Sequence, residues 1–514
     1  MTEHVDVLIV GAGLSGIGAA ATLAREHPGR RYAILEARDA IGGTWDLFRY
    51  PGVRSDSDMQ TLGYRFRPWT GEASIADGPS ILDYVRDTAR ESGVDRHVRL
   101  GHRVLAADWS SEHLRWTVRA EHDGEPVVFT ADFLMMCSGY YRYDRGHAPE
   151  FPGIADFRGR VVHPQFWPED LDHTGSRVVV IGSGATAVTL VPSMAATAAH
   201  VTMLQRSPTY IAKVPARDAL DLRLRRLVGT RAAYVAIRWK NVLAGMAQYT
   251  ASKRFPRLMK RMIVADAAAR LPEGYDVDTH FSPDYGPWDQ RFCAAPDGDF
   301  FAAIRAGTTE VVTDRIDTFT PTGIRLASGR ELDADLVVTA TGLELLFLGG
   351  AALSVDGTAI DPGREFVYRS SMLSGVPNLA FTVGYTNASW TLRADLVSGF
   401  VSRLLAHMDA RGHRVCVPPH PGPEVTRTPL LDLDSGYVRR GAHLMPTGGS
   451  RGPWRMGHNY LTDVRGMRHG RIDDGVLRFG GPVPAGPRPI PADGPATAGS
   501  ASGPTVPPGG AYSQ

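Results

Sequence analysis

The sequence predicts an α/β fold with two Rossmann-like dinucleotide-binding domains and a helical insertion. An apolar strand, a glycine loop and a helix of small residues follow one another twice along the chain. Each set is followed by a second apolar strand and later closes on an apolar segment that ends in glycine. Since strand–helix–strand crossovers are right-handed, each set should form a parallel sheet covered by helices.

The two sets have clear positions in the chain. The first comprises a strand at 5–10, a helix at 14–25, a strand at 32–36 and a closing segment at 131–139. The second comprises strands at 177–181 and 200–204 and a closing segment at 334–342. Two such units imply two nucleotide sites.

The first glycine loop has the pattern G-x-G-x-x-G, formed by Gly11, Gly13 and Gly16. Gly11 permits a tight turn, Gly13 lets a pyrophosphate approach the backbone, and Gly16 lets helix and strand pack closely. Glu36 follows 20 residues after Gly16, at the end of the second strand. Its carboxylate can accept hydrogen bonds from ribose hydroxyls and would repel a 2′-phosphate. This site therefore suits FAD or NAD rather than NADP.

The second glycine loop, formed by Gly182, Gly184 and Ala187, has alanine in place of the third glycine. Its second strand ends in Arg206 and Ser207 instead of an acid. A guanidinium group can pair with a 2′-phosphate, and a serine hydroxyl can donate a hydrogen bond to it. We therefore predict FAD at the first loop and NADPH at the second.

Two further segments indicate a family. Residues 157–168 fit F-x-G-x-x-x-H-x-x-x-W-P, and residues 42–56 fit G-G-x-W-x-x-x-x-Y-P-G-x-x-x-D. These patterns resemble the two fingerprints of type I Baeyer–Villiger monooxygenases, which are class B flavoproteins. Residues 284–291 and 384–390 resemble most closely the subgroup that contains the ethionamide-activating monooxygenase.

The resemblance implies a reaction. NADPH reduces FAD, and O2 then gives a C4a-peroxide that inserts one oxygen atom next to a ketone carbonyl, which yields an ester or lactone. Hydrophobic ketones, sulfides and thioamides are the substrates that this subgroup implies. The peroxide needs a fixed positive charge nearby and protection from water.

The resemblance also assigns roles to residues. Arg291 aligns with the arginine that stabilises the peroxide anion, and Asp56 with the acid that orients this arginine. Trp45 is expected to pack at the flavin. Gln290 stands where several members carry a lysine that helps hold the 2′-phosphate, so NADPH selectivity should depend mainly on Arg206.

Two residues have more open roles. His163 could act as an acid or base, but we interpret it as a hydrogen-bonded hinge residue that affects catalysis through domain motion. Asn387 is expected to cap a helix at 387–408. The N-terminus of that helix would face the flavin and stabilise negative charge on the reduced ring.

The predicted organisation follows from these sites. Residues 1–147 form the first part of the FAD-binding domain, 148–342 the NADP-binding domain, and 343–480 return to the FAD-binding domain with a strand at 376–384. Residues 481–514 form a Pro/Gly-rich tail, which we expect to be disordered. The insertion at about 217–270 has 13 Arg or Lys and three Asp or Glu residues. It is either a solvated helical subdomain or a contact for a membrane surface.

Composition excludes several classes of protein. A net charge of +1 gives no sign of a nucleic-acid partner. The three cysteines, Cys137, Cys293 and Cys416, form no C-x-x-C pair, so we expect no disulfide framework and a reducing compartment. Without a signal peptide or a run of about 18 apolar residues, the sequence predicts a cytoplasmic protein, with at most peripheral contact to the inner face of the membrane. We predict no metal site and infer no obligate protein partner.

Three alternatives stay open. An N- or S-hydroxylating flavin-containing monooxygenase would share both cofactors but use the protonated, electrophilic peroxide, and its products would differ. A flavin disulfide reductase would need a cysteine pair near the flavin, which the sequence lacks. A non-catalytic nucleotide-binding module would leave Arg291 and both fingerprints without a purpose.

Overall fold

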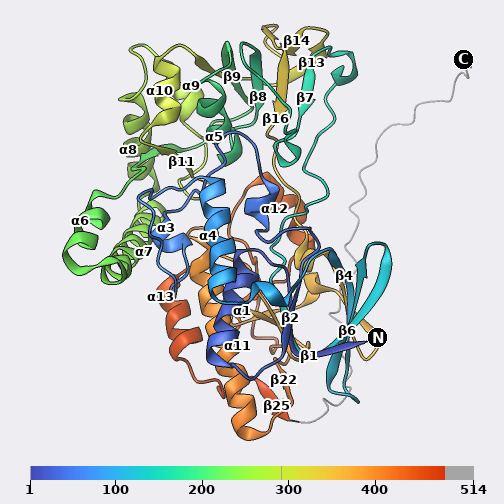
Figure 1. The fold of residues 1–514 in the computed structure, drawn as a ribbon. Coiled ribbons are helices and arrows are strands. Elements are labelled where there is room, and N and C mark those ends of the chain that lie inside the picture. Colours follow the sequence, from blue (N-terminus) through green and yellow to red (C-terminus); the bar gives the residue numbers. More distant parts are fainter. Residues whose placement is uncertain (1, 291, 481–514) are drawn as a thin grey trace, which may run out of the picture.

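The computed structural model describes residues 2–290 and 292–480, and the tail predicted to be disordered lies outside them. Figure 1 shows two α/β units, one above the other, each built on its own sheet. A helical lobe projects to one side of them. The predicted fold class is therefore confirmed.

The larger unit contains a sheet of nine strands with β1 (Glu3–Val10) near its middle. β1 pairs in parallel with β2 (Tyr32–Leu35) and β6 (Glu125–Met136). Its residues 7–9 are fully buried, as expected for a parallel strand covered on both faces. The other strands are β3 (Val98–Arg99), β4 (His102–Ser110), β5 (Arg115–His122), β17 (Ala352–Val355), β18 (Thr358–Ile360) and β21 (Leu379–Phe381).

Helices α1 (Leu14–Glu26), α4 (Gly78–Glu91) and α11 (Trp390–Arg411) share one core with this sheet. The strand predicted at 376–384 is shorter than expected and spans only β21. Asn378, just before it, has a left-handed backbone with φ 48°. Its side-chain amide donates to the carbonyl oxygens of Asp132 and Arg414, which ends the regular pairing there.

The smaller unit is a parallel sheet in the strand order β12-β9-β8-β16-β7, with α5 (Ala185–Met194) and α10 (Asp299–Arg305) packed in its core. Its five strands are β7 (Arg160–Val162), β8 (Arg177–Ile181), β9 (His200–Gln205), β12 (Thr309–Thr313) and β16 (Leu336–Thr339). An antiparallel sheet, β13 (Ile316–Thr320), β14 (Gly323–Leu326) and β15 (Glu331–Asp333), packs beside it.

The helical insertion consists of α6 (Ala219–Val228), α7 (Thr230–Arg254) and α8 (Pro256–Ala268). It leaves after β10 (Ile211–Val214) and returns through α9 (Val277–Phe281) to β11 (Cys293–Pro296). α7 packs on α3 (Met59–Leu62) of the larger unit, where the buried Arg238 donates to the carbonyl oxygens of Gln60 and Gly63. Among the described residues, no helix is both long and apolar enough to cross a bilayer.

Short elements complete the larger unit. They are α2 (Thr44–Leu47), β19 (Val367–Tyr368), β20 (Met372–Leu373), β22 (Val415–Val417), β23 (Arg427–Thr428), α12 (Gly436–Gly441), β24 (Gly448–Gly449), α13 (Tyr460–Asp463) and β25 (Arg478–Gly480).

Candidate active site

A cavity of about 770 Å³ begins at the carboxyl ends of β1 and β2 and reaches the second glycine loop. Gly11, Gly13 and Gly184 all contribute to its wall. Both predicted glycine loops therefore open into one cavity, at the edge where parallel sheets bind nucleotides.

The first loop has no space for side chains. Gly11 has φ 103°, and a Cβ atom added to it would lie 2.7 Å from the carbonyl oxygen of Cys137. A Cβ atom at Gly16 would lie 1.8 Å from the carbonyl oxygen of Gly11. α1 begins after Gly13, and no side chain of the described residues caps it. Its first backbone N–H groups are thus available to a phosphate group in the cavity.

Glu36 lies in the same cavity wall and is 6% exposed. Its two carboxylate oxygens accept hydrogen bonds from the backbone N–H of Ala12 at 2.7 Å and of Arg38 at 2.9 Å. Burial raises the pKa of this carboxyl, while the two N–H groups oppose the shift. Each oxygen keeps a lone pair that can accept a ribose hydroxyl.

The fingerprint at 42–56 packs directly on this loop. The N–H of Gly42 donates to the carbonyl oxygen of Ala12 at 3.1 Å, and a Cβ atom at Gly43 would lie 2.9 Å from the Cα of Gly13. Trp45 follows and lines the cavity. The contact gives a steric reason for glycine at 43, while at 42 an added Cβ atom would lie 2.3 Å from Cδ1 of Leu82.

Asp46 is a residue of this site that the sequence did not reveal. It is 3% exposed and accepts hydrogen bonds from Arg38 at 2.6 Å and Arg86 at 2.9 Å. The pair holds Arg38 in the cavity wall, where its charge can face a phosphate. Asp46 occupies an undefined position of the fingerprint, so only the structure shows its function.

The rest of the same fingerprint joins the two units. A Cβ atom at Gly52 would lie 1.8 Å from Oγ of Ser193 in α5, so only glycine lets the fingerprint segment approach α5 this closely. Arg54 forms an ion pair of 2.5 Å with Asp299 at the start of α10. Asp56, at the end of the fingerprint, lines the cavity.

The second loop separates two functions of glycine. Gly182 has φ 137°, and a Cβ atom there would lie 2.3 Å from the carbonyl oxygen of Ala340. At Gly184 an added Cβ atom meets nothing within 4 Å. The structure alone therefore gives no steric reason for glycine at 184, whereas a pyrophosphate passing close to the backbone would. Ala187 is fully buried in the core of this unit.

Arg206 and Ser207 follow β9 directly and are exposed. Ser207 lines the cavity, and its carbonyl oxygen accepts a hydrogen bond of 3.2 Å from Oγ of Ser183 in the glycine loop. The end of β9 thus lies beside the second loop, as the assignment to NADPH requires.

A second cavity, of about 1340 Å³, lies between the helical insertion and the larger unit. Apolar and aromatic side chains from three parts of the chain contribute to it, among them Met246, Trp288, Phe292 and Leu392. Four residues line both cavities: Asp56, Ser57, Tyr385 and Ala388. The two spaces therefore share one wall, at the predicted acid.

A buried ion pair fixes the position of Tyr385 in that wall. Its hydroxyl donates to Asp463 at 2.6 Å, and the Arg393 guanidinium lies 3.9 Å from its ring centre. Arg393 is fully buried, 3.2 Å from Asp463. The sequence signal for this cluster was weak, because the three residues are up to 78 positions apart.

Arg291 lies outside the described residues. Its neighbours show where the segment leads: Gln290 lines the first cavity and Phe292 the second. Asp289 accepts hydrogen bonds from Lys253 and from the backbone N–H of Gly286, both at 2.8 Å. The predicted catalytic segment is therefore anchored to α7 of the insertion.

His163 lies where the chain passes between the two units. Its Nδ1 accepts a hydrogen bond of 3.2 Å from the N–H of Gln165, and the Gln165 amide donates to the carbonyl oxygens of Arg142 and Tyr143. Burial lowers the pKa of His163. A neutral imidazole at this crossing agrees with a hinge, and the role stays a prediction.

The prediction that Asn387 caps a helix is wrong. α11 begins at Trp390, with Ser389 in the capping position and no side-chain cap among the described residues. The Asn387 amide instead donates to the carbonyl oxygen of His458 at 2.9 Å. The side chain is committed to the neighbouring loop at 456–459 and lines the second cavity.

The fold and this pair of cavities define a protein with two dinucleotide-binding units whose glycine loops open into one cavity. A family model described as flavin-binding monooxygenase-like matches residues 74–224, and one for an NAD(P)-binding Rossmann-like domain matches residues 9–68. The chain is 56% identical over 488 residues to the FAD-containing monooxygenase EthA of Mycobacterium tuberculosis, covering 95% of this chain and all of the relative. It is 54% identical to EthA of Mycolicibacterium smegmatis, covering 93% and 98%.

The chain therefore belongs to the family of FAD-containing monooxygenases that includes these relatives, and it is an FAD-dependent monooxygenase. Solved structures with the same fold include cyclohexanone monooxygenase in an open state, with TM-score 0.73, 21% identity, and coverage of 93% of this chain and 100% of that one. A steroid monooxygenase bound to NADP has TM-score 0.72, 23% identity, and coverage of 93% and 99%. The resemblance predicted from the two fingerprints is confirmed.

The different surroundings of two glycines generate a prediction. Gly16→Ala should destabilise the larger unit by more than about 3 kcal/mol and abolish flavin binding, because the methyl group would overlap a backbone oxygen that cannot move aside. Gly184→Ala should change stability by less than about 1 kcal/mol, yet raise the KM for NADPH. Urea unfolding, bound-flavin absorbance and steady-state kinetics measure the three effects. Equal stability losses for both variants would contradict this account.

Proposed function

We propose that this chain binds FAD at the first glycine loop and NADPH at the second, and inserts one oxygen atom of O2 next to the carbonyl group of a hydrophobic ketone. The product would be an ester or lactone, and sulfides or thioamides would be oxidised in the same space. One observation carries the proposal: the nucleotide cavity and the larger second cavity meet at Asp56, Ser57, Tyr385 and Ala388.

The residues of the first cavity fit FAD. The uncapped start of α1 would bind the pyrophosphate, and Glu36 would accept the ribose hydroxyls. Trp45 would pack at the flavin, and the loop that includes Asn387 would approach it from the second cavity. Support comes from a solved structure of the same fold, OTEMO in complex with FAD and NADP, with TM-score 0.68, 22% identity, and coverage of 81% of this chain and 87% of that one.

NADPH would occupy the second loop. The open space at Gly184 would admit its pyrophosphate, and Arg206 with Ser207 would bind the 2′-phosphate. Ala187 would allow α5 to pack closely on β8. NADPH provides two electrons, so that one oxygen atom enters the product and the other leaves as water.

Bound FAD, once reduced by NADPH, supplies activated oxygen. The protein supplies positive charge and exclusion of water. The guanidinium group of Arg291 would place a permanent positive charge beside the reacting oxygen, since guanidinium groups do not lose a proton at working pH. Asp56 would orient that cation from the shared wall. The apolar part of the second cavity's lining, which includes Met246, Trp288, Phe292 and Leu392, would bind the substrate and limit entry of water.

The catalytic assignment yields a mutational prediction. Arg291→Ala should leave flavin binding intact but lower ketone oxygenation at least about 100-fold, because removal of one charge-stabilising group typically costs two or three orders of magnitude. Arg291→Lys should recover part of the activity. Ester formation is measured by gas chromatography with mass detection, and NADPH consumption is followed in parallel. Ester formation by Arg291→Ala at nearly the wild-type rate would exclude the arginine from the mechanism.

The same product assay separates the proposal from its main alternative. An N- or S-hydroxylating monooxygenase would yield sulfoxide or hydroxylamine and no ester from any ketone of a broad panel. The proposal requires at least one ester or lactone. Aliphatic, cyclic and aromatic ketones belong in the panel, because the second cavity is large.

A prediction for coenzyme choice follows from the end of β9. Arg206→Gln should raise the KM for NADPH roughly 10- to 100-fold, the effect expected from losing one charge-assisted hydrogen bond. The KM for NADH should stay unchanged, since NADH lacks the 2′-phosphate. Steady-state kinetics with both coenzymes give the ratio. A parallel rise for NADH would mean that Arg206 acts on the fold and not on the 2′-phosphate.

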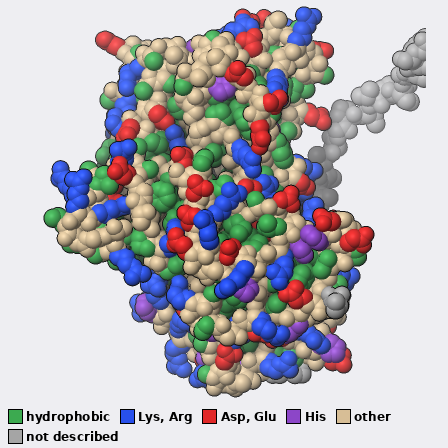
Figure 2. All heavy atoms as spheres, viewed as in Figure 1, with side chains coloured by type: hydrophobic (Ala, Val, Ile, Leu, Met, Phe, Trp, Pro, Cys, Tyr) green, Lys and Arg blue, Asp and Glu red, His purple; other side chains and the backbone are tan. Residues whose placement is uncertain are grey.

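We also propose peripheral contact between the insertion and an anionic membrane surface. Large apolar side chains on α6 and α8 are exposed, Leu227 at 78% and Met262 at 57%, and Phe255 between α7 and α8 is exposed at 58%. Figure 2 shows Lys and Arg side chains among apolar ones on this lobe. Such a combination suits an interfacial contact with acidic head groups.

Sedimentation with vesicles tests this contact. The protein should sediment with phosphatidylglycerol vesicles and much less with phosphatidylcholine vesicles. Leu227→Gln combined with Phe255→Gln should reduce the sedimented fraction several-fold. Leu105→Gln, which changes an exposed leucine on β4, should have no effect. Equal sedimentation of the double variant and the wild type would refute the contact.

A further inference from the structure

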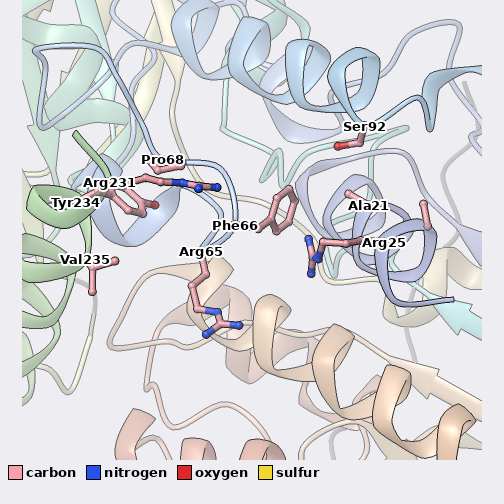
Figure 3. A pocket seen from close by; sticks show the side chains of 10 residues that line it. Ala21, Arg25, Arg65, Phe66, Pro68, Ser92, Arg231, Tyr234 and Val235 are labelled. Atoms are coloured by element: carbon pink, nitrogen blue, oxygen red, sulfur yellow. The ribbon is translucent and has the colours of Figure 1, made fainter. Parts of the chain in front are cut away.

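Two adjoining pockets of about 580 and 330 Å³ lie between α1, the segment 65–68 and α7. The pocket of about 580 Å³ is called the outer pocket and is drawn in Figure 3, and the pocket of about 330 Å³ is called the inner pocket. None of its described lining residues belongs to the nucleotide cavity or the second cavity. The inner pocket borders the second cavity through Val242 and Tyr460. The outer pocket is therefore a separate feature that the monooxygenase reaction does not explain.

The pockets hold an excess of positive charge. Five arginines line them: Arg25, Arg65, Arg231, Arg238 and Arg468. Two have carboxylate partners, Arg25 with Glu26 at 3.0 Å and Arg238 with Asp395 at 2.9 Å. The side chains of the other three make no hydrogen bond or ion pair with any residue that the structure describes. Three guanidinium groups thus line the two pockets without a hydrogen bond or ion pair, while Asp395 acts on Arg65 and Arg468 only at longer range.

Asp395 cannot neutralise this excess. One of its oxygens accepts both the Arg238 guanidinium at 2.9 Å and the backbone N–H of Arg65 at 3.0 Å. Arg238 is 5% exposed, so the two residues form a buried pair. Burial, and next the charge of Arg65, lower the pKa of the Arg468 guanidinium. An anion placed between Arg65 and Arg468 would relieve this repulsion.

Apolar surface accompanies the charge. In Figure 3, Arg25 and Arg231 reach toward Phe66 from opposite sides, while Arg65 turns away toward the C-terminal helices. The Arg25 guanidinium lies 4.9 Å from the Phe66 ring centre. Val235, 51% exposed, and Trp239, 37% exposed, lie four residues apart on α7 and share one face. A strip of apolar side chains therefore begins where the arginines gather.

We propose that these pockets bind an anionic head group, phosphate or carboxylate, that carries an apolar chain. Arg65 belongs to both pockets and would bind the head group together with Arg468, and Arg231 would add charge at the outer pocket. The chain would lie along Phe66, Val235 and Trp239. Guanidinium groups suit this ligand because their planar donors match two oxygens at once.

The experiment uses the flavin-loaded full chain and decyl phosphate below its micelle concentration as the probe, with binding measured by calorimetry. Inorganic phosphate should bind at least about 10-fold more weakly, because it lacks the chain. Arg65→Gln combined with Arg468→Gln should weaken decyl phosphate at least about 10-fold. A matched control, Arg223→Gln with Arg226→Gln, removes the same charge from exposed positions on α6 and should bind as the wild type does.

Several outcomes would overturn the proposal. These are no binding of decyl phosphate, equal loss in the α6 control, unchanged affinity of the pocket variant, or equal binding of inorganic phosphate. Retained flavin and an unchanged unfolding temperature establish that the pocket variant is folded. If it is not, Arg231→Gln, at an exposed position, replaces it and should weaken decyl phosphate several-fold; unchanged affinity would again overturn the proposal.

Vesicles identify the source of the ligand. Because α6 belongs to the lobe proposed to contact a membrane, the reference here is Arg115→Gln with Arg119→Gln, which removes the same charge from exposed positions on β5. If the pocket variant sediments less with phosphatidylglycerol vesicles than this β5 variant does, the head group belongs to a bilayer lipid. If only decyl phosphate distinguishes the two variants, the ligand is a free amphiphile. Both results support the site, and the separate membrane proposal has its own test in Leu227 and Phe255.

Discussion

The structure depends on close backbone contacts in the two glycine loops, at Gly16 in the first turn of α1 and at Gly182 directly after β8. A Cβ atom added at Gly16 would lie 1.8 Å from a carbonyl oxygen, and one added at Gly182 would lie 2.3 Å from another. Both distances are too short for any side chain. These close contacts bring the uncapped helix starts to the cavity edge, where a phosphate group can reach them. The fingerprint segments then occupy the space that the glycines leave, and the two units meet through Gly52 and the ion pair of Arg54 with Asp299.

Much of this site is predictable from the sequence because it depends on local patterns. A glycine loop needs only its own strand and helix, and Glu36 follows at a spacing that the βαβ unit sets. Fingerprint residues such as Trp45 are recognised in the same way. Asp46 is adjacent to Trp45, yet its burial between two arginines is visible only once the chain is folded.

Features that depend on distant segments could not be predicted. Arg393, Tyr385 and Asp463 meet because α11 packs against α13, and Asp463 follows Arg393 by 70 residues in the chain. The prediction that Asn387 caps a helix was wrong for a related reason. A local rule favours asparagine at a helix start, but a tertiary hydrogen bond to His458 claims its amide and the helix begins three residues later. The charge pattern of the insertion showed that it was basic, yet not that Arg65 and Arg468 from elsewhere would join Arg231.

The helix α7 contributes to the wall of the second cavity, while none of its described residues lines the nucleotide cavity. Substitutions on its inner face, such as at Met246 or Tyr249, would therefore reshape the second cavity and leave the described lining of the nucleotide cavity unchanged. For a protein engineer, that helix is where a library of variants would alter selectivity at the least risk to the redox machinery.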